Sequence, residues 1–224
     1  MDDATRNELL LLKDLGYTHL DVASVEAGFS RPAPAESGAC TDLLGELERL
    51  ALVCEKCRLA KTRTQVVYGV GSPKADLMFI GEAPGRDEDI QGQPFVGRAG
   101  QLLTDIIKAM KLTRDDVYIA NVIKCRPPEN RNPEPDELEA CRPWLRRQIE
   151  IIQPKVIVTL GRFALQSLTE KGYAISSVRG QWLDYDGIRV MPTYHPAYLL
   201  RNPAAKKEVW ADMKKVMAEL GIAA

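Results

Sequence analysis

The chain has 224 residues, of which 45% are hydrophobic and 27% charged, so it holds enough apolar mass for one packed domain and a tail. No apolar run is long enough to span a bilayer and the acidic start MDDATRNE differs from a signal peptide, so we expect a cytoplasmic protein with no membrane partner. The first 50 residues hold ten acids and four bases, whereas the remaining residues hold 21 acids and 26 bases. This basic body permits nucleic-acid binding, although an ordinary mixed surface explains the charge equally well.

The first 41 residues are expected to form a flexible extension outside the folded body. Residues 5–15 can form a short amphipathic helix, and the stretch GFSRPAPAESGA (28–39) has the composition of a linker. The extension is either a disordered tail or a segment that docks a protein partner. We expect the folded domain to cover residues 42–224 and to begin with a helix in the run DLLGELERLALVCEKC.

The folded body alternates between short apolar runs and helical patterns. The expected strands cover residues 77–80, 117–122, 156–160 and 190–193. The expected helices cover residues 98–111, 136–152, 161–171 and about 204–220. This alternation predicts an α/β fold with a parallel sheet covered on both faces, in which ligands bind at the carboxyl ends of the strands. The polar residues that follow the strands should therefore gather at one edge of the sheet.

A long connection rich in glycine and proline follows the first expected strand. It contains GEAPG (81–85), three acids (87–89) and Phe95 within GQPFVG (92–97), and a helical pattern starts near Arg98. The GEAPG segment favours a tight turn that lets a ligand approach the backbone closely. A connection this long between a strand and a helix is usually functional, with an ordinary loop as the alternative.

Four of the five cysteines have a spacing that suits a metal centre. Cys54 and Cys57 form a C-x-x-C pair, Cys125 follows the second expected strand, and Cys141 lies on the next helix. Four thiolates suit either zinc or an iron–sulfur cluster, and the residues alone do not choose between them. Buried structural thiols are the alternative, and a redox C-x-x-C motif would leave two cysteines unexplained. Cys40, in the linker, is expected to be free.

Several motifs together resemble the family 4 uracil-DNA glycosylases, which carry an iron–sulfur cluster. They are GEAPG with its following acids, GQPFVGRAGQLL, ANVIKCRPPENRNP, EACRPWL, VTLGRFA and YHPAYLLR, in family order over most of the body. The resemblance implies a three-layer α/β/α sandwich around a central four-stranded parallel sheet. It implies a monomeric, monofunctional glycosylase that excises uracil from single- or double-stranded DNA by hydrolysing the N-glycosidic bond. By motif position, Cys54, Cys57, Cys125 and Cys141 would hold a [4Fe–4S] cluster.

Excision of a base requires that the base leave the stack and enter a pocket. Phe95 suits the stacking surface, and Asn121 suits the reader of the Watson–Crick edge because an amide offers a donor and an acceptor. His195 suits stabilisation of the negative charge that develops near O2 of uracil, and Gly81 lies in the turn expected to contact the base. The structural alternatives are a core phenylalanine, a strand-end amide and a satisfied histidine.

The group that positions the attacking water is the least defined part of the pattern. A better-known branch of the superfamily has an aspartate at the third position of the turn motif, where this chain has Ala83. Glu82 and Glu88 are the candidates to orient the water, and Glu88 is also a candidate to wall off the C5 position and exclude thymine. A solvated loop or a helix N-terminus is the alternative for these acids.

The segment after His195 is the candidate contact with DNA. Tyr198, Leu199 and Leu200 form an apolar tip that suits insertion into the gap left by a flipped base, with the start of a core helix as the alternative. The basic residues expected to contact phosphates are Arg98, Lys124, Arg126, Arg131 and Arg201.

Two other functions compete with the glycosylase. A non-catalytic iron–sulfur module that binds nucleic acid would leave Phe95, Asn121 and His195 at one pocket edge unexplained. An electron-transfer protein would be expected to carry a flavin or nicotinamide fingerprint, and GEAPG is not one.

Overall fold

The computed structural model describes residues 39–223, which belong to the compact unit Ser37–Ala224. The expected N-terminal helix, most of the linker and the side chain of Cys40 lie outside the described part. The first helix, α2 (Ala39–Leu52), begins three residues before the expected start of the domain at residue 42. Within residues 39–223, no helix is long and apolar enough to cross a membrane.

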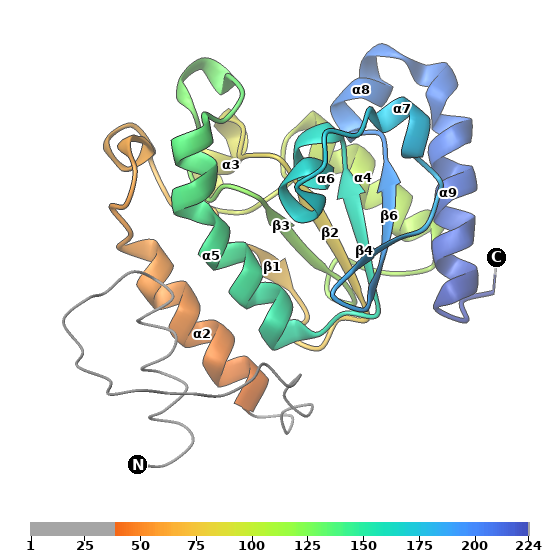
Figure 1. Ribbon diagram of the computed structural model, residues 1–224, viewed down its shortest axis with the longest axis horizontal. Coiled ribbons are helices and arrows are strands. Elements are labelled where there is room, and N and C mark those ends of the chain that lie inside the picture. The colour runs from red at the N-terminus through yellow and green to blue at the C-terminus, as the bar shows by residue number, and fades with distance from the viewer. Residues whose placement is uncertain (1–38, 224) are drawn as a thin grey trace. The chain divides into compact units, whose positions relative to one another are not determined.

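A six-stranded sheet with the order β1-β3-β2-β4-β6-β5 forms the centre of this unit (Figure 1). The four central strands run parallel to one another, and they are the strands that the apolar runs predict. These are β2 (Leu77–Gly81), β3 (Tyr118–Asn121), β4 (Val156–Leu160) and β6 (Ile188–Thr193). The expected total of four strands is wrong, because β1 (Val70–Gly71) and β5 (Leu183–Tyr185) add antiparallel edges. Edge strands of two and three residues leave no apolar run in the sequence.

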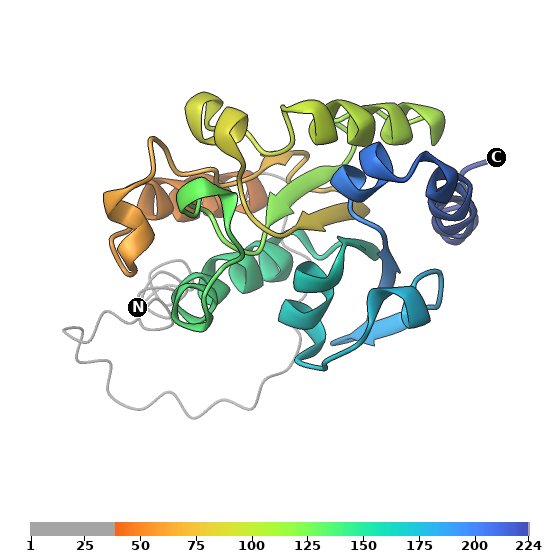
Figure 2. The same cartoon turned by 90° about the horizontal axis from the view of Figure 1, so that it is seen from above.

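Helices cover both faces of the sheet, so the α/β/α sandwich is confirmed (Figure 2). The helices after α2 are α3 (Arg86–Gln91), α4 (Arg98–Ala109), α5 (Pro135–Ile152), α6 (Arg162–Thr169), α7 (Ile175–Val178), α8 (Pro196–Arg201) and α9 (Lys206–Glu219). Three short 3-10 turns are η1 (Arg58–Lys61), η2 (Pro128–Asn130) and η3 (Pro203–Ala205). The helices expected at 98–111, 136–152, 161–171 and about 204–220 are α4, α5, α6 and α9. The short helix α7 was not predicted, whereas α3 and α8 lie where a helix start was kept as the alternative.

Apolar packing covers the central strands of the sheet. All residues of β2 and β4 are buried, as expected for strands that are covered on both faces. On one face, Phe79 of β2 and Val158 of β4 pack in the same core as Leu103 of α4 and Met213 of α9. Burial of each such side chain contributes about 1.5–3 kcal/mol. The packed sheet therefore holds the loops at its carboxyl edge in position.

Candidate active site and cysteine cavity

A pocket opens at the carboxyl edge of the sheet, where the sequence places its unusual polar residues. Its wall includes Glu82, Ala83, Gly85, Glu88, Phe95, Asn121, Arg131, His195, Tyr198 and Arg201. Three loops, one after each of β2, β3 and β6, meet there, so residues more than 100 positions apart share one wall. A larger cavity between α5, α6 and β5 contains none of the predicted site residues. We therefore take the pocket at the sheet edge as the candidate active site.

Gly81 lies between two of the predicted uracil-binding side chains. The register of β2 and β3 pairs Gly81 with Asn121. A Cβ atom at position 81 would lie 2.4 Å from Oδ1 of Asn121 and 2.5 Å from Cζ of Phe95. Because Gly81 has no side chain, the amide of Asn121 and the ring of Phe95 can both pack against the end of β2.

The backbone at Phe95 adopts a left-handed conformation, with φ of 56°. Such a conformation costs a non-glycine residue on the order of 1 kcal/mol and needs support from its surroundings. Arg114 supplies it, because Nη1 donates to the carbonyl oxygen of Phe95 at 3.1 Å and Nη2 donates to that of Pro94 at 2.7 Å. Gly100 of α4 also supports the loop, since a Cβ atom there would come within 1.9 Å of the Phe95 carbonyl carbon.

Sequence reasoning missed both of these supports. A glycine inside a helical pattern was a usable signal for Gly100, because it often marks close backbone approach. Arg114 had no such signal, since its partners are carbonyl groups that meet it only in the folded chain.

His195 caps the N-terminus of α8. Its Nδ1 accepts a hydrogen bond from the backbone N–H of Ala197 at 3.1 Å, so a neutral ring carries its proton on Nε2. Burial is the main cause that lowers the pKa of His195 to about 4, and Arg201 contributes in the same direction against an opposing effect of Glu88. The ring lies with its centroid 5.7 Å from that of Phe95. The neutral Nε2–H donor of His195 thus lies beside the ring of Phe95.

The side chain of Asn121 is buried in the pocket wall, with 2% of its surface exposed. Its Oδ1 atom has no hydrogen-bond partner within the described residues. A buried acceptor that lacks a partner costs about 1–3 kcal/mol, so such atoms often mark a ligand position. In this pocket, the missing partner would be a donor on the bound molecule.

The two candidate water-orienting acids lie in different environments. The carboxylate of Glu88 accepts backbone N–H groups from Gly85 at 3.1 Å and from Val96 and Gly97 at 3.0 Å each. It therefore ties the turn after β2 to the loop that carries Phe95. Glu82 is half-buried in the pocket wall, where burial raises its pKa and Arg162 lowers it.

The apolar tip expected to contact DNA divides into exposed and buried residues. Tyr198 and Leu200 are 38% and 37% exposed on α8, and the ring of Tyr198 lies 4.8 Å from that of Tyr194. Leu199 is only 1% exposed, so the prediction that it contacts DNA is wrong. It points into the core with Phe95 and Leu103, which is the alternative that the sequence left open.

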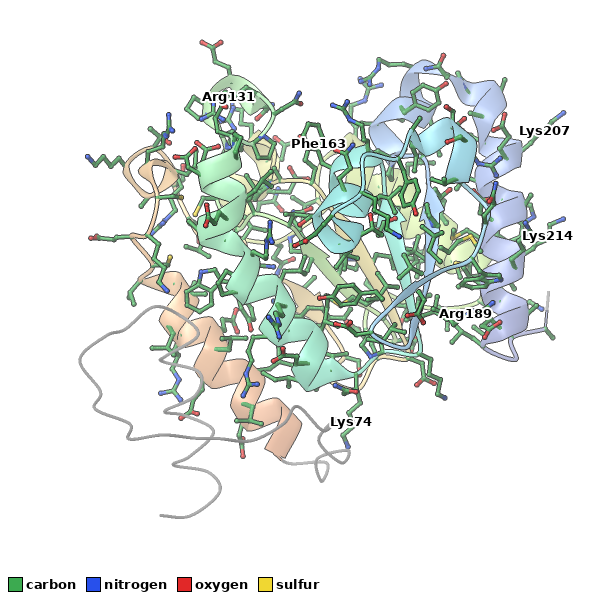
Figure 3. All side chains as sticks on the ribbon, in the orientation of Figure 1. Lys74, Arg131, Phe163, Arg189, Lys207 and Lys214 are labelled. Atoms are coloured by element: carbon green, nitrogen blue, oxygen red, sulfur yellow. The ribbon has the colours of Figure 1, made fainter. Side chains whose placement is uncertain are left out.

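The basic residues expected at phosphates also have different partners. Arg98 and Arg201 are exposed, and Arg126 donates to the side chain of Asn130 at 2.7 Å. Arg131, near the N-terminal end of α5 (Figure 3), donates through two nitrogens to the buried carboxylate of Glu137 at 2.9 and 2.6 Å. These two hydrogen bonds hold the loop after β3 and use N–H groups that Arg131 would otherwise offer to a phosphate.

Lys124 has no access to a phosphate. It is 2% exposed, and its Nζ donates to the backbone oxygen of Asn121 at 2.9 Å and to Oε1 of Gln148 at 2.6 Å. The prediction that Lys124 contacts the DNA backbone is therefore wrong.

The four predicted metal-binding cysteines line a second, mostly apolar cavity. All four are free thiols, and Nη1 of Arg63 lies 3.4 Å from Sγ of Cys125 while the backbone N–H of Lys124 donates to Sγ of Cys141 at 3.2 Å. Burial raises the pKa of Cys141 to about 12 and also raises the pKa values of Cys57 and Cys125.

The four thiols have the chemistry of a metal-centre donor set. Within residues 39–223, no group of three or more His, Cys, Asp or Glu side chains is placed to hold a metal ion. Four thiols that line one cavity are nevertheless the residue types that hold a four-iron cluster, which takes one thiolate at each iron. A positive side chain and backbone N–H donors next to the sulfurs suit the negative charge of such a centre. The residues therefore fit an iron–sulfur cluster.

Comparison with known proteins agrees with the pocket. The family model of the uracil DNA glycosylase superfamily matches residues 68–214. The type-4 uracil-DNA glycosylase of Archaeoglobus fulgidus is 47% identical over 77% of this chain and 91% of its own. Those of Sulfurisphaera tokodaii and Thermotoga maritima are 50% and 51% identical, over 78% and 72% of this chain and 84% and 86% of theirs. The chain therefore belongs to the uracil DNA glycosylase superfamily, in the branch of the type-4 enzymes.

Proposed function

We propose that this chain is a monofunctional DNA glycosylase that takes uracil out of the DNA stack, hydrolyses its N-glycosidic bond and leaves an abasic site. The observation that carries the proposal is the buried, unpartnered Oδ1 of Asn121 in one pocket with Phe95 and His195. A flipped base brings a planar ring and an N–H donor to such a pocket. The relatives named type-4 uracil-DNA glycosylases point to uracil as that base.

Recognition of uracil follows from the donors and acceptors of the amide. Oδ1 of Asn121 accepts the N3–H of uracil, and the amide N–H₂ donates to O4. Cytosine has an acceptor at N3 and a donor at C4, so both contacts become repulsive. The ring of Phe95 lies beside the amide, and the base stacks against it.

Cleavage leaves electrons on the base and positive charge on the sugar. As the bond between C1′ and N1 breaks, Nε2–H of His195 donates to O2, where negative charge gathers. A fixed donor of this kind contributes on the order of 3 kcal/mol to the transition state. The oxygen of a water molecule then bonds to C1′ and releases one proton, and the uracil anion takes up a proton as it leaves.

Glu82 is the better candidate to orient the water. Both acids line the pocket, but the carboxylate of Glu88 already accepts three backbone N–H groups and so has less capacity left to hold a water molecule. Burial raises the pKa of Glu82. Because the sugar is positively charged when water attacks, the carboxylate has to position the water more than to deprotonate it. Ala83 provides no base.

Water, not an amine, is the proposed nucleophile. A glycosylase with lyase activity attacks C1′ with an amine, but no lysine lines the pocket among residues 39–223. This supports the monofunctional reaction. No observation favours the non-catalytic module, which leaves unexplained why Phe95, Asn121 and His195 line one pocket.

The proposed cofactor is a [4Fe–4S] cluster held by Cys54, Cys57, Cys125 and Cys141. When bound, it would cross-link the segment between α2 and η1, the loop after β3 and α5 through four thiolate bonds. We expect Cys141→Ser to lose most of its iron and its visible absorbance, whereas Cys40→Ser, which changes the cysteine expected to be free, should keep both. Equal iron in the two variants would contradict the assignment.

The oligomeric state, the cellular location, the DNA contacts and the domain bounds of the enzyme are also proposals. We infer that it acts as a monomer in the cytoplasm, where free thiols are common. Uracil in single- or double-stranded DNA is the substrate, Tyr198, Leu200 and Arg201 contact the strand, and Arg98 and Arg126 approach phosphates. The residues before α2 are the proposed extension, either a disordered tail or a segment that docks a protein partner, and the glycosylase domain is proposed to begin with α2.

The experiment is direct. Iron-replete protein is incubated with an oligonucleotide that carries one uracil, and alkali then converts any abasic site into a strand break. We expect cleavage at the uracil and none in a matched strand with thymine at that position. Absence of cleavage at the uracil would contradict the proposed function, and His195→Ala should keep DNA affinity while losing most of the excision rate.

A further inference from the structure

Lys124 connects the cysteine cavity with the residue that reads the base. Its backbone N–H donates to Sγ of Cys141 at 3.2 Å, its carbonyl oxygen accepts the N–H of Val67 at 2.8 Å, and the next residue is Cys125. Its side chain turns the other way, and Nζ donates to the backbone oxygen of Asn121 at 2.9 Å. One residue thus has its backbone at the cysteine sulfurs and its Nζ at the backbone of Asn121, which lines the candidate active site.

The ammonium group is held firmly in this place. Nζ also donates to Oε1 of Gln148 at 2.6 Å, and Nε2 of Gln148 donates to the carbonyl oxygen of Tyr68 and the hydroxyl of Tyr118, each at 3.0 Å. These partners belong to α5, to the segment before β1 and to β3. The network therefore leaves the ammonium little freedom to move away from Asn121.

Burial of a lysine side chain at this position has an unfavourable free energy of desolvation. An ammonium group taken out of water loses several kcal/mol of solvation, and its side-chain partners here are neutral oxygens. An apolar side chain of the same length would pack without that cost. Cys141 and Cys125 also interact with the charge of this group, and the ring centroid of Tyr68 lies 5.8 Å from Nζ. Among these contacts, the hydrogen bond to the carbonyl oxygen of Asn121 is the one that joins Lys124 to a residue of the candidate active site.

The position of that carbonyl matters for recognition. Asn121 is the last residue of β3, and beyond it the chain turns to reach Cys125. The N–H groups of Val122 and Ile123 still donate to the carbonyl oxygens of Gly81, the last residue of β2, and of Glu82, the next residue, at 3.0 and 3.2 Å. Nζ of Lys124 donates to the carbonyl oxygen of Asn121 at the start of the same turn, so this turn is held by contacts at both of its ends.

We propose that Lys124 is a positioning residue that aligns Asn121 for uracil from the cysteine side of the turn. This inference rests on the proposed function. It does not make Lys124 a catalytic residue, because its ammonium group touches the backbone of Asn121 and not the base.

The test compares Lys124→Met with Lys155→Met, whose exposed lysine pairs with Asp76 at 2.8 Å just before β4 begins. Binding is measured to DNA with a non-cleavable 2′-fluoro-deoxyuridine and to the same DNA with an abasic site. We expect Lys124→Met to keep its iron and its abasic-site affinity but to bind the uracil analogue about 10-fold more weakly. Lys155→Met should match the wild type in both assays.

A double-mutant cycle separates positioning from general damage to the fold. If Lys124 acts through Asn121, Lys124→Met should add nothing to the loss of analogue binding caused by Asn121→Ala. Additive losses, or equal losses for both DNAs, would overturn the inference. Should Lys124→Met fail to fold, the same cycle is run with Lys124→Gln, which keeps a donor on a shorter side chain and should lose less affinity.

The two proposals fail in different ways. Wild-type protein that leaves uracil in DNA contradicts the proposed function. Active wild-type protein together with Lys124 variants that bind the analogue normally contradicts only the positioning role.

Discussion

The backbone N–H of Ala197 donates to Nδ1 of His195 at 3.1 Å, and this bond decides how the histidine can act. A protonated imidazole would carry hydrogens on both nitrogens, so Nδ1 would face another N–H group. The contact therefore favours the neutral ring with its proton on Nε2, in agreement with the pKa of about 4 that burial produces. His195 then works as a neutral donor to the leaving uracil.

The excision rate should consequently be insensitive to pH around 6.5, where an ordinary histidine titrates. We expect the single-turnover rate to keep its value as the pH falls through 6.5 and to drop only as the pH approaches 4, where the acceptor at Nδ1 is lost. His195→Gln should be slow and should lack this acidic limb. A rate that changes near pH 6.5 in the wild type but not in His195→Gln would contradict the neutral form.

The same pKa shift predicts how stability depends on pH. Because the pKa of His195 is about 4 in the folded chain and near 6.5 when unfolded, the unfolded state binds more protons between these values. The free energy of unfolding should therefore fall as the pH drops from 6.5 to 4, by up to about 3 kcal/mol. Urea titrations at several pH values check this.

The matched variant for that measurement is His195→Gln, which has no titrating side chain at position 195. Its free energy of unfolding should depend less steeply on pH between 4 and 6.5. His195 itself contributes nothing above pH 6.5, where both states are neutral. Identical slopes for the two proteins would assign the acid sensitivity to other groups.

Removal of the Arg114 clamp should weaken excision through Phe95. Arg114→Lys keeps the charge but cannot donate to the carbonyl groups of Pro94 and Phe95 in the forked geometry of a guanidinium group. We expect a loss of about 10-fold in kcat/KM, because the stacking ring is no longer held at its angle. The measurement is steady-state excision with oligonucleotide substrates.

The control for Arg114→Lys is Arg49→Lys on α2, where the guanidinium group makes one exposed contact with Glu46 at 3.5 Å. That variant should retain wild-type kinetics. If Arg114→Lys does so as well, the left-handed backbone at Phe95 is held by other contacts, such as those of Gly100.

The parts of the fold that sequence could predict are those whose cause is local. Continuous apolar runs predicted all four central strands, since strands buried on both faces need no alternation. The edge strands β1 and β5 have no such run, and their partners are defined only when the sheet forms. Leu199 and Leu200 show the limit inside one motif, because adjacent helical residues point in different directions and only the packing says which one is buried.

The candidate site divides in the same way. Phe95, Asn121 and His195 could be selected from residue type and from their position after a strand, and the pocket brings them together. Arg114 and Lys124 could not be assigned, because each acts on backbone carbonyl groups that carry no mark in the sequence. A lysine next to a metal-binding motif in a basic body suggests a phosphate contact, and only its burial overturns that interpretation.

A methyl group at position 81 tests the geometry of the pocket most sharply. The Cβ atom of Gly81→Ala would lie 2.4 Å from Oδ1 of Asn121 and 2.5 Å from the ring of Phe95, so the two uracil contacts cannot both keep their positions. We expect excision to fall by about 100-fold, because a displacement near 1 Å at a reacting centre has an effect of this size. Single-turnover kinetics on DNA with one uracil measure it.

The matched variant is Gly172→Ala, since a Cβ atom there meets nothing within 4 Å. It should leave excision unchanged, and both variants should retain the iron content of the wild type because neither touches the cysteine cavity. Gly81→Ala with normal excision would mean that Phe95 and Asn121 do not need to close on the end of β2, and the stacking and reading roles proposed for them would fail together.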